Sequence, residues 1–146
     1  ILPFAFSDKK NTFNKFIETS IKDGAASNSF GVNYDGNGNE ILDYKTEFFT
    51  YGTTIDDFFE NQFKESYPNY IKIDVDGIEH LIINGGKNII KNHVSELLVE
   101  VSESFDSQKQ TIIKLMNEYG FKLIWKKASF ATKNKNHFTL NYLFKK

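Results

Sequence analysis

The spacing of apolar and polar residues along the chain predicts an α/β fold. Short β-branched apolar runs are typical of buried strands, and apolar residues at every third or fourth position are typical of helices. By these signals the later part of the chain is expected to form helix, strand, helix, strand, helix, strand and strand, over residues 53–67, 70–75, 77–93, 96–101, 107–119, 121–127 and 137–144. Strands that alternate with helices favour a mostly parallel sheet covered on both faces. The last two strands favour an antiparallel pair.

Local signals give the expected ends of the helices. Thr53 or Thr54, with an aspartate three residues on, is typical of a helix cap, and Pro68 is expected to stop that helix. Its core stripe should consist of apolar residues at helical spacing, Ile55, Phe58, Phe59 and Phe63. The Gly85-Gly86 pair should break the next helix, and Gly120 should close the last one.

The first part of the chain gives weaker signals. Residues 1–6 are expected to form a strand that ends at a polar turn, and residues 12–18 are weakly extended. Residues 23–39 are small and polar and predict a long irregular loop, which in a compact domain is often functional. Alternation over residues 43–51 predicts another strand.

Composition narrows the classes of function. The chain has 146 residues, 40% of them hydrophobic, which is enough for one domain with a core. Its formal net charge is −1, so nucleic-acid and anionic-membrane binding are not expected. The absence of cysteine excludes disulfides, thiolate zinc sites and cysteine nucleophiles. No apolar run could span a membrane, and we expect a cytoplasmic protein.

The strongest chemical signal is the run from Lys72 to Glu79, Lys-Ile-Asp-Val-Asp-Gly-Ile-Glu. It places Asp74, Asp76 and Glu79 at the mouth of a predicted central strand, where ligands of parallel sheets bind. Asp74 lies between two apolar residues and is expected to be buried. Carboxylates in such a cluster could hold a hard cation, accept a proton or bind an amine.

Each of these residues also has a structural interpretation. Asp76 and Glu79 have the spacing of a capping box, so both could simply bind free N–H groups of the helix. The run from Glu100 to Glu103 could be a second cluster or a solvated strand end. His80 follows Glu79 and is a candidate general base, although lone histidines are often structural. The three histidines lack metal-ligand spacing, so we expect no metal site. A phosphate loop, a Gly-x-Gly-x-x-Gly motif and a Gly-x-Ser-x-Gly elbow are absent from the chain.

These motifs, in this order, resemble the FkbM-type family of S-adenosylmethionine-dependent methyltransferases. In that family a Leu-Asp-Asp-like helix start precedes a strand reading Lys-Ile-Asp-Val-Glu-Gly-x-Glu, then a Gly-Ala pair and a strand that ends in Val-Glu-Val. The similar segments here are residues 54–57, 72–79, 85–86 and 98–101, with weaker likeness at 3–8 and 26–29. Two residues depart from the pattern: Asp76 stands where Glu is usual, and Gly86 where Ala is usual.

The resemblance implies a class I methyltransferase sheet and methyl transfer from S-adenosylmethionine to a hydroxyl of a sugar or natural product. It implies that Asp74 lies beside the methyl group, with Asp76 and Glu79 on the acceptor side. It also implies that Ala5, Phe6, Ser7 and Asp8 border the adenine. The glycine-rich first turn of the family is not in this chain, so we expect residues 1–146 to be a single partial domain that lacks the first strands.

Two other functions stay open at this point. Asp74-Val75-Asp76 could be the Asp-x-Asp of a glycosyltransferase, which holds a divalent metal and a nucleotide sugar. Alternatively, the carboxylates only cap helices, and the chain is a non-catalytic binding or assembly module. We also expect an exposed sheet edge, which a second copy of the chain could cover.

Overall fold

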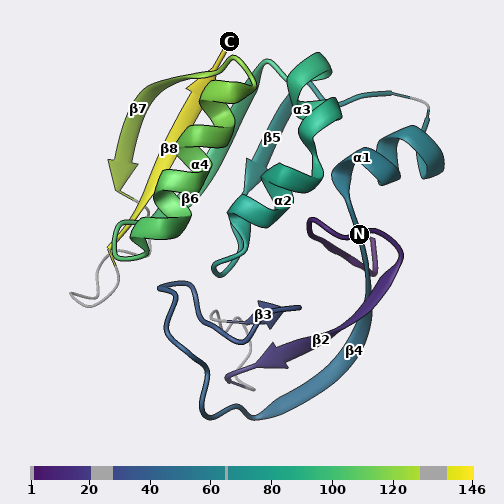
Figure 1. The fold of residues 1–146 in the computed structure, drawn as a ribbon, viewed down its shortest axis with the longest axis vertical. Helices are drawn as coiled ribbons and strands as arrows, with labels where there is room; N and C mark the ends of the chain where they lie inside the picture. The colour runs from purple at the N-terminus through teal and green to yellow at the C-terminus, as the bar shows by residue number, and fades with distance from the viewer. Residues whose placement is uncertain (1, 21–27, 65, 129–137) are drawn as a thin grey trace.

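The computed structural model describes residues 2–20, 28–64, 66–128 and 138–146. Their strands form two four-stranded sheets, one from the earlier and one from the later part of the chain (Figure 1). In chain order the elements are β1 (Ala5–Phe6), β2 (Thr12–Glu18), β3 (Ser29–Phe30), β4 (Thr46–Thr53), α1 (Ile55–Asp57), the π-helical turn η1 (Phe58–Gln62), β5 (Tyr70–Ile73), α2 (Glu79–Gly85), α3 (Lys87–His93), β6 (Glu96–Ser102), α4 (Asp106–Glu118), β7 (Lys122–Ala128) and β8 (Thr139–Lys145).

The second sheet has the strand order β5-β6-β8-β7. β5 and β6 are parallel, from Tyr70 opposite Glu96 to Ile73 opposite Val99. β8 lies between β6 and β7 and is antiparallel to both, so the predicted C-terminal antiparallel pair is confirmed. β5 is an edge strand of this sheet, on the side nearest the first sheet.

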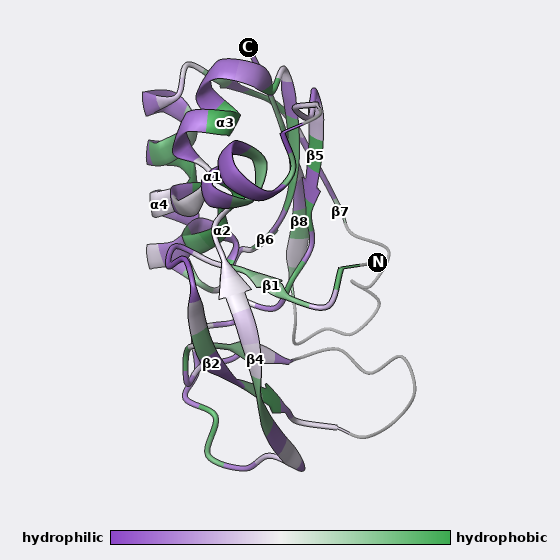
Figure 2. Cartoon of the chain, turned by 90° about the vertical axis from the view of Figure 1, so that its right-hand side faces the viewer, coloured by the Kyte–Doolittle hydropathy of each residue, from purple (hydrophilic) through white to green (hydrophobic). Residues whose placement is uncertain are grey.

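The fold is α/β with mixed sheets, and the prediction of a mostly parallel sheet covered on both faces is wrong for the described residues. Among them, only β1–β4 and β5–β6 pair in parallel. Helices α2, α3 and α4 all lie on one face of the second sheet, which Figure 2 shows from the side. Residues of β6 accordingly alternate between buried and half-buried. The reason is that β8, the last strand of the chain, inserts antiparallel between β6 and β7. The crossover through α4 therefore joins two strands that run in the same direction but are not neighbours.

The first sheet has the order β1-β4-β2-β3. β2 and β4 pair antiparallel along their whole length, from Thr12 opposite Gly52 to Glu18 opposite Thr46, so residues 12–18 form a full strand. The N-terminal strand pairs in parallel with β4 and not with a strand of the second sheet. The predicted long loop contains β3 and a bridge between Tyr34 and Glu40, while residues 21–27 lie outside the described residues.

The core lies between the second sheet and its helices. Most of its fully buried members come from β6, β8 and the three helices, and include Leu97, Val99, Val101, Tyr142, Phe144, Ile83, Ile90, Ile112 and Met116. Helix α4 buries Ile112 and Met116 fully in this core, and its Ile113 and Leu115 are partly buried against it. No helix among the described residues is long and apolar enough to cross a bilayer.

The predicted helix ends are partly confirmed. Thr54 caps α1, since its side chain accepts a hydrogen bond from Asp57 N at 3.0 Å. The helix changes into η1 and ends at Gln62, earlier than the predicted stop at Pro68, and of its predicted stripe only Ile55 is buried. The break between α2 and α3 falls at Gly86, as expected.

Candidate active site

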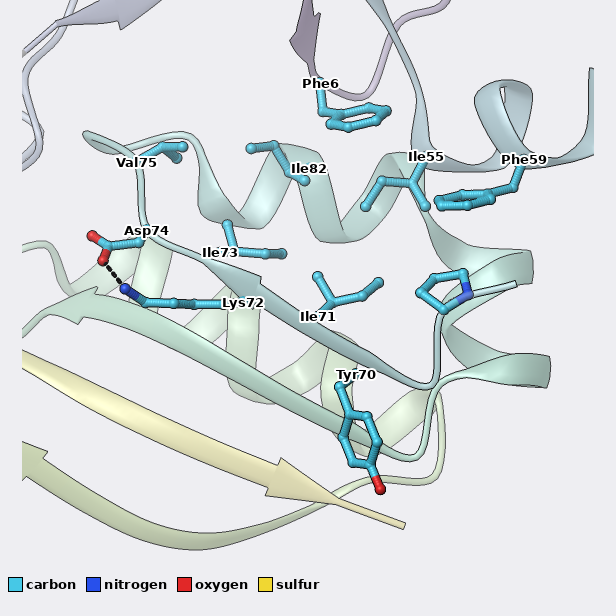
Figure 3. A pocket seen from close by; sticks show the side chains of 11 residues that line it. Phe6, Ile55, Phe59, Tyr70, Ile71, Lys72, Ile73, Asp74, Val75 and Ile82 are labelled. Carbon is cyan, nitrogen blue, oxygen red and sulfur yellow. Dashed lines mark hydrogen bonds and ion pairs between the residues drawn. The ribbon is translucent and has the colours of Figure 1, made fainter. Parts of the chain in front are cut away.

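Asp74 follows directly on β5, at the carboxyl end of the strand. The pairing with β6 ends at Ile73, so Asp74 is not part of the strand, and the prediction that it is buried is wrong: 42% of its side chain is exposed. Its carboxylate forms an ion pair with Lys72 Nζ at 2.5 Å, drawn in Figure 3. The hydrogen bond to Asp74 raises the pKa of the Lys72 ammonium.

An apolar groove lies between the first sheet and the end of β5. It has a volume of about 390 Å³ and is lined by Phe4, Ala5, Phe6, Phe16, Asn28, Ser29, Phe30, Asp74, Val75, Asp76, Ile78 and Ile82. Four of the residues that the sequence singled out, Ala5, Phe6, Asp74 and Asp76, thus meet in this groove. Asn28 N donates to Asp76 Oδ2 at 3.0 Å and joins the two sheets across it.

A second groove continues from the apolar groove along the open edge of β5 (Figure 3). Its volume is about 460 Å³, and it shares Phe6, Asp74, Val75 and Ile82 with the apolar groove. We call it the edge groove. Ile71 and Ile73 of β5 point toward Ile82 of α2, and Phe6 and Phe59 lie on the same side of β5 as Ile82. The two grooves therefore run together beside β5.

Ser7 and Asp8 do not line either groove. They border a separate cavity of about 240 Å³, together with Tyr34 and Leu81 among others. Ser7 is buried, and its hydroxyl donates to Lys9 O at 3.2 Å within the turn after β1. The structure therefore separates the predicted adenine-binding residues into two pairs.

Glu79 is the first residue of α2 and is buried, with 3% exposed. Its Oε2 accepts a hydrogen bond from Gln108 Nε2 at 2.7 Å, and its Oε1 is 3.5 Å from Gly77 N. Burial raises the pKa of Glu79 to about 8, so its side chain is largely protonated at neutral pH. The N-cap residue of α2 is Ile78, so Asp76 and Glu79 do not form the reciprocal capping box that their spacing suggested.

A small polar cavity of about 60 Å³ lies beside Glu79, on the other side of Val75 and Asp76 from the apolar groove. It is lined by Asp35, Gly36, Asn37, Val75, Asp76, Glu79, Glu100, Ser102, Gln108 and Thr139. Val75 and Asp76 thus line both the apolar groove and the polar cavity.

The predicted second cluster divides between two surroundings. Glu100 lines the polar cavity, and the buried Ser102 donates to Asn37 Oδ1 at 3.0 Å. Glu103 instead accepts hydrogen bonds from the Tyr142 hydroxyl and from Lys109 Nζ, the latter at 3.3 Å. Glu103 therefore ties α4 to β8, while Glu100 and Ser102 belong to the candidate site.

His80 lines neither of the two grooves. Its ring meets the edge of Phe105 with the centroids 6.3 Å apart, and it is not among the residues that line the cavities described above. Its Nδ1 is buried without a hydrogen-bond partner in the described part of the chain. Burial lowers the pKa of His80, so the ring is neutral at pH 7.

Sequence reasoning missed Gln108 and Asn28. Gln108 occupies the first position of the inward stripe of α4, four residues before Ile112, where an apolar residue is the rule. A polar side chain at that position was a usable signal for a buried hydrogen bond. Asn28 lies in the 26–29 segment of weaker family likeness, which gave no sign of its hydrogen bond to Asp76.

The comparison with known families agrees with this site. The methyltransferase FkbM domain matches residues 2–123, which is most of the chain. The chain belongs to the FkbM methyltransferase family. The match covers the first sheet, β5, β6 and the residues that line the apolar groove and the edge groove, and the resemblance drawn from residues 54–101 is confirmed. No curated protein sequence and no solved structure matches the chain.

No group of three or more histidine, aspartate or glutamate side chains in the described part of this FkbM-family chain is placed to hold a metal ion. Of the two aspartates in the Asp-x-Asp run, Asp74 pairs with Lys72 and Asp76 accepts from Asn28 N. The contacts of these aspartates therefore do not support the hypothesis of a metal-dependent glycosyltransferase.

Proposed function

We propose that this FkbM-family chain takes part in S-adenosylmethionine-dependent methyl transfer to a hydroxyl oxygen of a small acceptor, such as a sugar or a natural product. The observation that carries the proposal is the position of Val75 and Asp76, which line an apolar groove on one side and a polar cavity on the other. An apolar groove suits a cofactor with a purine ring, and a polar cavity suits a hydroxylated acceptor. Two adjoining sites bring both reactants to the same turn of backbone.

The residues of the apolar groove fit the cofactor in their chemistry. Four phenylalanine rings offer apolar surface to a purine, and the carboxylate of Asp74 attracts positive charge. Asn28 Oδ1 is buried without a partner in the described part of the chain and can accept a hydrogen bond from an amino group. Ala5, Phe6, Asp74 and Asn28 would hold the cofactor, which supplies a methyl group on a sulfonium sulfur when bound. Ser7 and Asp8 line another cavity, and the proposal does not use them.

Asp76 has the position of the proton acceptor. An acceptor hydroxyl must lose its proton as its oxygen gains the methyl group, and a carboxylate beside that hydroxyl takes the proton. Asp76 lines both sites, and Asn28 N fixes its Oδ2. Glu79 is largely protonated at neutral pH and is a poor base there, so its part is to hold the Gly77 turn together with Gln108. The proposal leaves His80 outside the reaction.

The open edge of β5 bears on how the site is completed. β5 pairs only with β6 in the described residues, and the edge groove runs beside its free edge. Unpaired strand edges bind further strands readily. The chain has no glycine-rich cradle, so we propose that the cofactor binds more tightly when this edge is covered, for instance by a second copy of the chain.

Calorimetry with S-adenosylmethionine tests the proposal. We expect saturable binding by the chain, and a loss of at least tenfold in affinity for Asp74→Asn. The matched control is Asp43→Asn, which changes an aspartate with 87% of its side chain exposed and outside both grooves. If a second copy of the chain covers the free edge of β5, the affinity for S-adenosylmethionine should rise with protein concentration. The sedimentation coefficient should rise over the same concentrations, because the chains associate.

Three results distinguish the alternatives. Equal affinity for the wild type and Asp74→Asn would remove Asp74 from the cofactor site. Binding of a nucleotide sugar that depends on Mn²⁺, without binding of S-adenosylmethionine, would favour the glycosyltransferase. Binding of neither would contradict the methyl-transfer proposal and leave a binding or assembly module.

A further inference from the structure

Charged residues are distributed unevenly along the chain. Residues 1–120 contain eleven lysines and all nineteen acidic residues, whereas residues 121–146 contain seven lysines and no acidic residue. The formal net charge of −1 therefore combines an acidic part with a strongly basic C-terminal part. A total charge near zero does not exclude attraction between this basic part and an anionic surface.

The basic part forms the side of the second sheet that lies farthest from the first sheet. It contributes β7 and β8, and β7 is the outermost strand in the order β5-β6-β8-β7 (Figure 1). Three strand spacings of about 4.8 Å each separate β7 from β5. Charges at β5 and in the strands beyond it are thus farther from β7 than the Debye length of about 8 Å, so salt screens them.

Two lysines of β7 keep their charge uncompensated. Lys122 and Lys127 are exposed and form no ion pair with a described residue. Lys127 Nζ lies over the Trp125 ring, 4.7 Å from its centroid, in a contact that does not neutralise the ammonium group. Lys126 is compensated in part, because its Nζ lies 4.0 Å from Glu103 Oε1. β7 thus presents a short row of cations at the edge of the sheet.

Apolar side chains lie exposed among these lysines. The pairing of β7 with β8 shifts between Leu123 and Trp125, so Ile124 is the extra residue of a β-bulge. Ile124 is 54% exposed and Leu123 is 37% exposed. Lysines and bulges also protect an edge strand from pairing with other strands. That role favours a charged or polar residue at the bulge, so it leaves the exposed isoleucine unexplained.

An anionic lipid surface matches this combination of side chains. Ammonium groups attract anionic headgroups, and an aliphatic side chain gains free energy when it enters the boundary between headgroups and acyl chains. A nucleic acid matches it less well. The chain contains no arginine, the side chain that binds phosphate with two parallel hydrogen bonds, and Lys127 lies over the one tryptophan ring on which a base could stack.

We propose that the outer edge of β7 binds the surface of an anionic lipid bilayer, with Lys122, Lys126 and Lys127 at the headgroups and Ile124 inserted between them. This surface is separate from the two grooves and the polar cavity, because no residue of β7 is among those that line them. The proposal therefore does not depend on methyl transfer, and the two can fail separately.

Vesicle sedimentation with the whole chain tests the proposal. Phosphatidylcholine vesicles that contain about 30% phosphatidylserine should sediment the chain at about 0.1 M salt, whereas phosphatidylcholine alone should not. Salt at about 0.5 M should release the chain. Trp125 is the only tryptophan in the chain and lies in β7, so its fluorescence reports contact at this strand. Its emission should shift to shorter wavelength with the anionic vesicles alone.

The double variant Lys122→Gln/Lys127→Gln removes the two uncompensated charges. Each lysine near an anionic surface contributes about fivefold to the affinity, so the double variant should bind about 20-fold more weakly. The matched control is Lys64→Gln/Lys87→Gln, which removes two exposed lysines that lie outside β7. It makes the same change in net charge and should bind as the wild type does.

Ile124→Ser tests the inserted side chain separately from the charges. Its affinity for the anionic vesicles should fall by about tenfold, because the exposed half of the isoleucine no longer enters the lipid. Leu42→Ser, at a position that is 85% exposed and far from β7 in the sequence, should cause no loss. An unchanged affinity in Ile124→Ser would overturn the insertion.

Other results would overturn the whole proposal. Equal binding to both kinds of vesicle would exclude attraction by headgroup charge. Equal affinities of the two lysine double variants, or unchanged emission of Trp125, would place the lipid contact outside β7. If the chain does not bind anionic vesicles but retards an oligonucleotide in a gel, the lysines bind nucleic acid. If it binds neither, they only protect the edge of the sheet.

Discussion

The two sheets differ in how they are held together. The second sheet buries one face under α2, α3 and α4, and its core residues come from six of its elements. The first sheet contributes few buried apolar side chains, and several of its aromatic rings face solvent: Phe13 is 70% exposed and Phe49 is 69% exposed. Burial of apolar surface therefore stabilises the second sheet, while the first depends on its contacts with the second.

Those contacts are close and largely polar. The turn after β1 lies against α2, where a Cβ on Gly85 would come within 2.1 Å of Ser7 O. Asp35 O lies against Gly77, and Asn37 Oδ1 accepts hydrogen bonds from Ser102 and Ser104. Both the apolar groove and the polar cavity lie along this junction. The candidate site therefore depends on docking of the first sheet more than on the core.

The largest effect should come from emptying the core of the second sheet. Phe121 is fully buried, so Phe121→Ala should lower the free energy of unfolding by about 3–5 kcal/mol. The same change in the first sheet, Phe13→Ala, should stay within about 0.5 kcal/mol because that ring is exposed. Urea unfolding of both variants measures the difference. Similar losses would show that the first sheet has a core of its own. If Phe121→Ala does not fold, Phe121→Leu should still lose more stability than Phe13→Ala, with a smaller loss than that expected for Phe121→Ala.

A smaller effect should come from forcing the sheets apart. Gly85→Ala places a methyl group against Ser7 O, where backbone must move, and should cost about 1–3 kcal/mol. Gly36→Ala is the control, because its new Cβ would have no neighbour closer than 3.7 Å. Hydrogen exchange locates the change: amides of β2 and β4 should exchange faster in Gly85→Ala, while those of β6 keep their protection. Faster exchange in β6 as well would show that the two sheets unfold as one unit.

The sequence predicted the second sheet better than the first for a physical reason. The runs at 70–75 and 96–101 are locally apolar, and the helices between them have a regular stripe, so short-range patterns determine these elements. The pairing of β1 with β4 joins residues about fifty positions apart, and no local pattern specifies such a partner. Segments that consist mostly of loops, and that pack through polar contacts, show no periodic pattern of apolar residues in the sequence.

The candidate site, too, could be predicted only where its residues are neighbours in the sequence. The cluster of Asp74, Asp76 and Glu79 could be found because its members are neighbours in the chain, and two of them line the apolar groove. Asp74 was expected to be buried because it follows an apolar residue, yet the ladder with β6 ends one residue earlier. The partners that give each carboxylate its surroundings, Asn28 and Gln108, lie 48 and 29 residues away from Asp76 and Glu79, respectively. Only the fold brings them together.

The smallest effect should come from the polar link between the segment after β4 and the second sheet. Both carboxylate oxygens of Asp56 accept hydrogen bonds from the start of α3, from Asn88 N at 3.0 Å and from Ile89 N at 2.9 Å. α3 has only seven residues, and its N-cap residue, Gly86, has no side chain to cap it. Asp56→Ala leaves both N–H groups without that acceptor and should cost about 1 kcal/mol, the usual loss for a helix cap.

Asp43→Ala is the matched control for this link, because its carboxylate is exposed and makes only a 3.8 Å contact with Lys45 Nζ in the described structure. Its loss should stay below about 0.5 kcal/mol. Hydrogen exchange at Asn88 and Ile89 should quicken in Asp56→Ala and stay unchanged in Asp43→Ala. Equal stability of the two variants would mean that water replaces the carboxylate at α3 without loss. The close contact between Gly85 and Ser7 O would then contribute more to the stability of the junction than the Asp56 cap does. The stability losses of Gly85→Ala and Asp56→Ala would then differ by more than their contacts alone suggest.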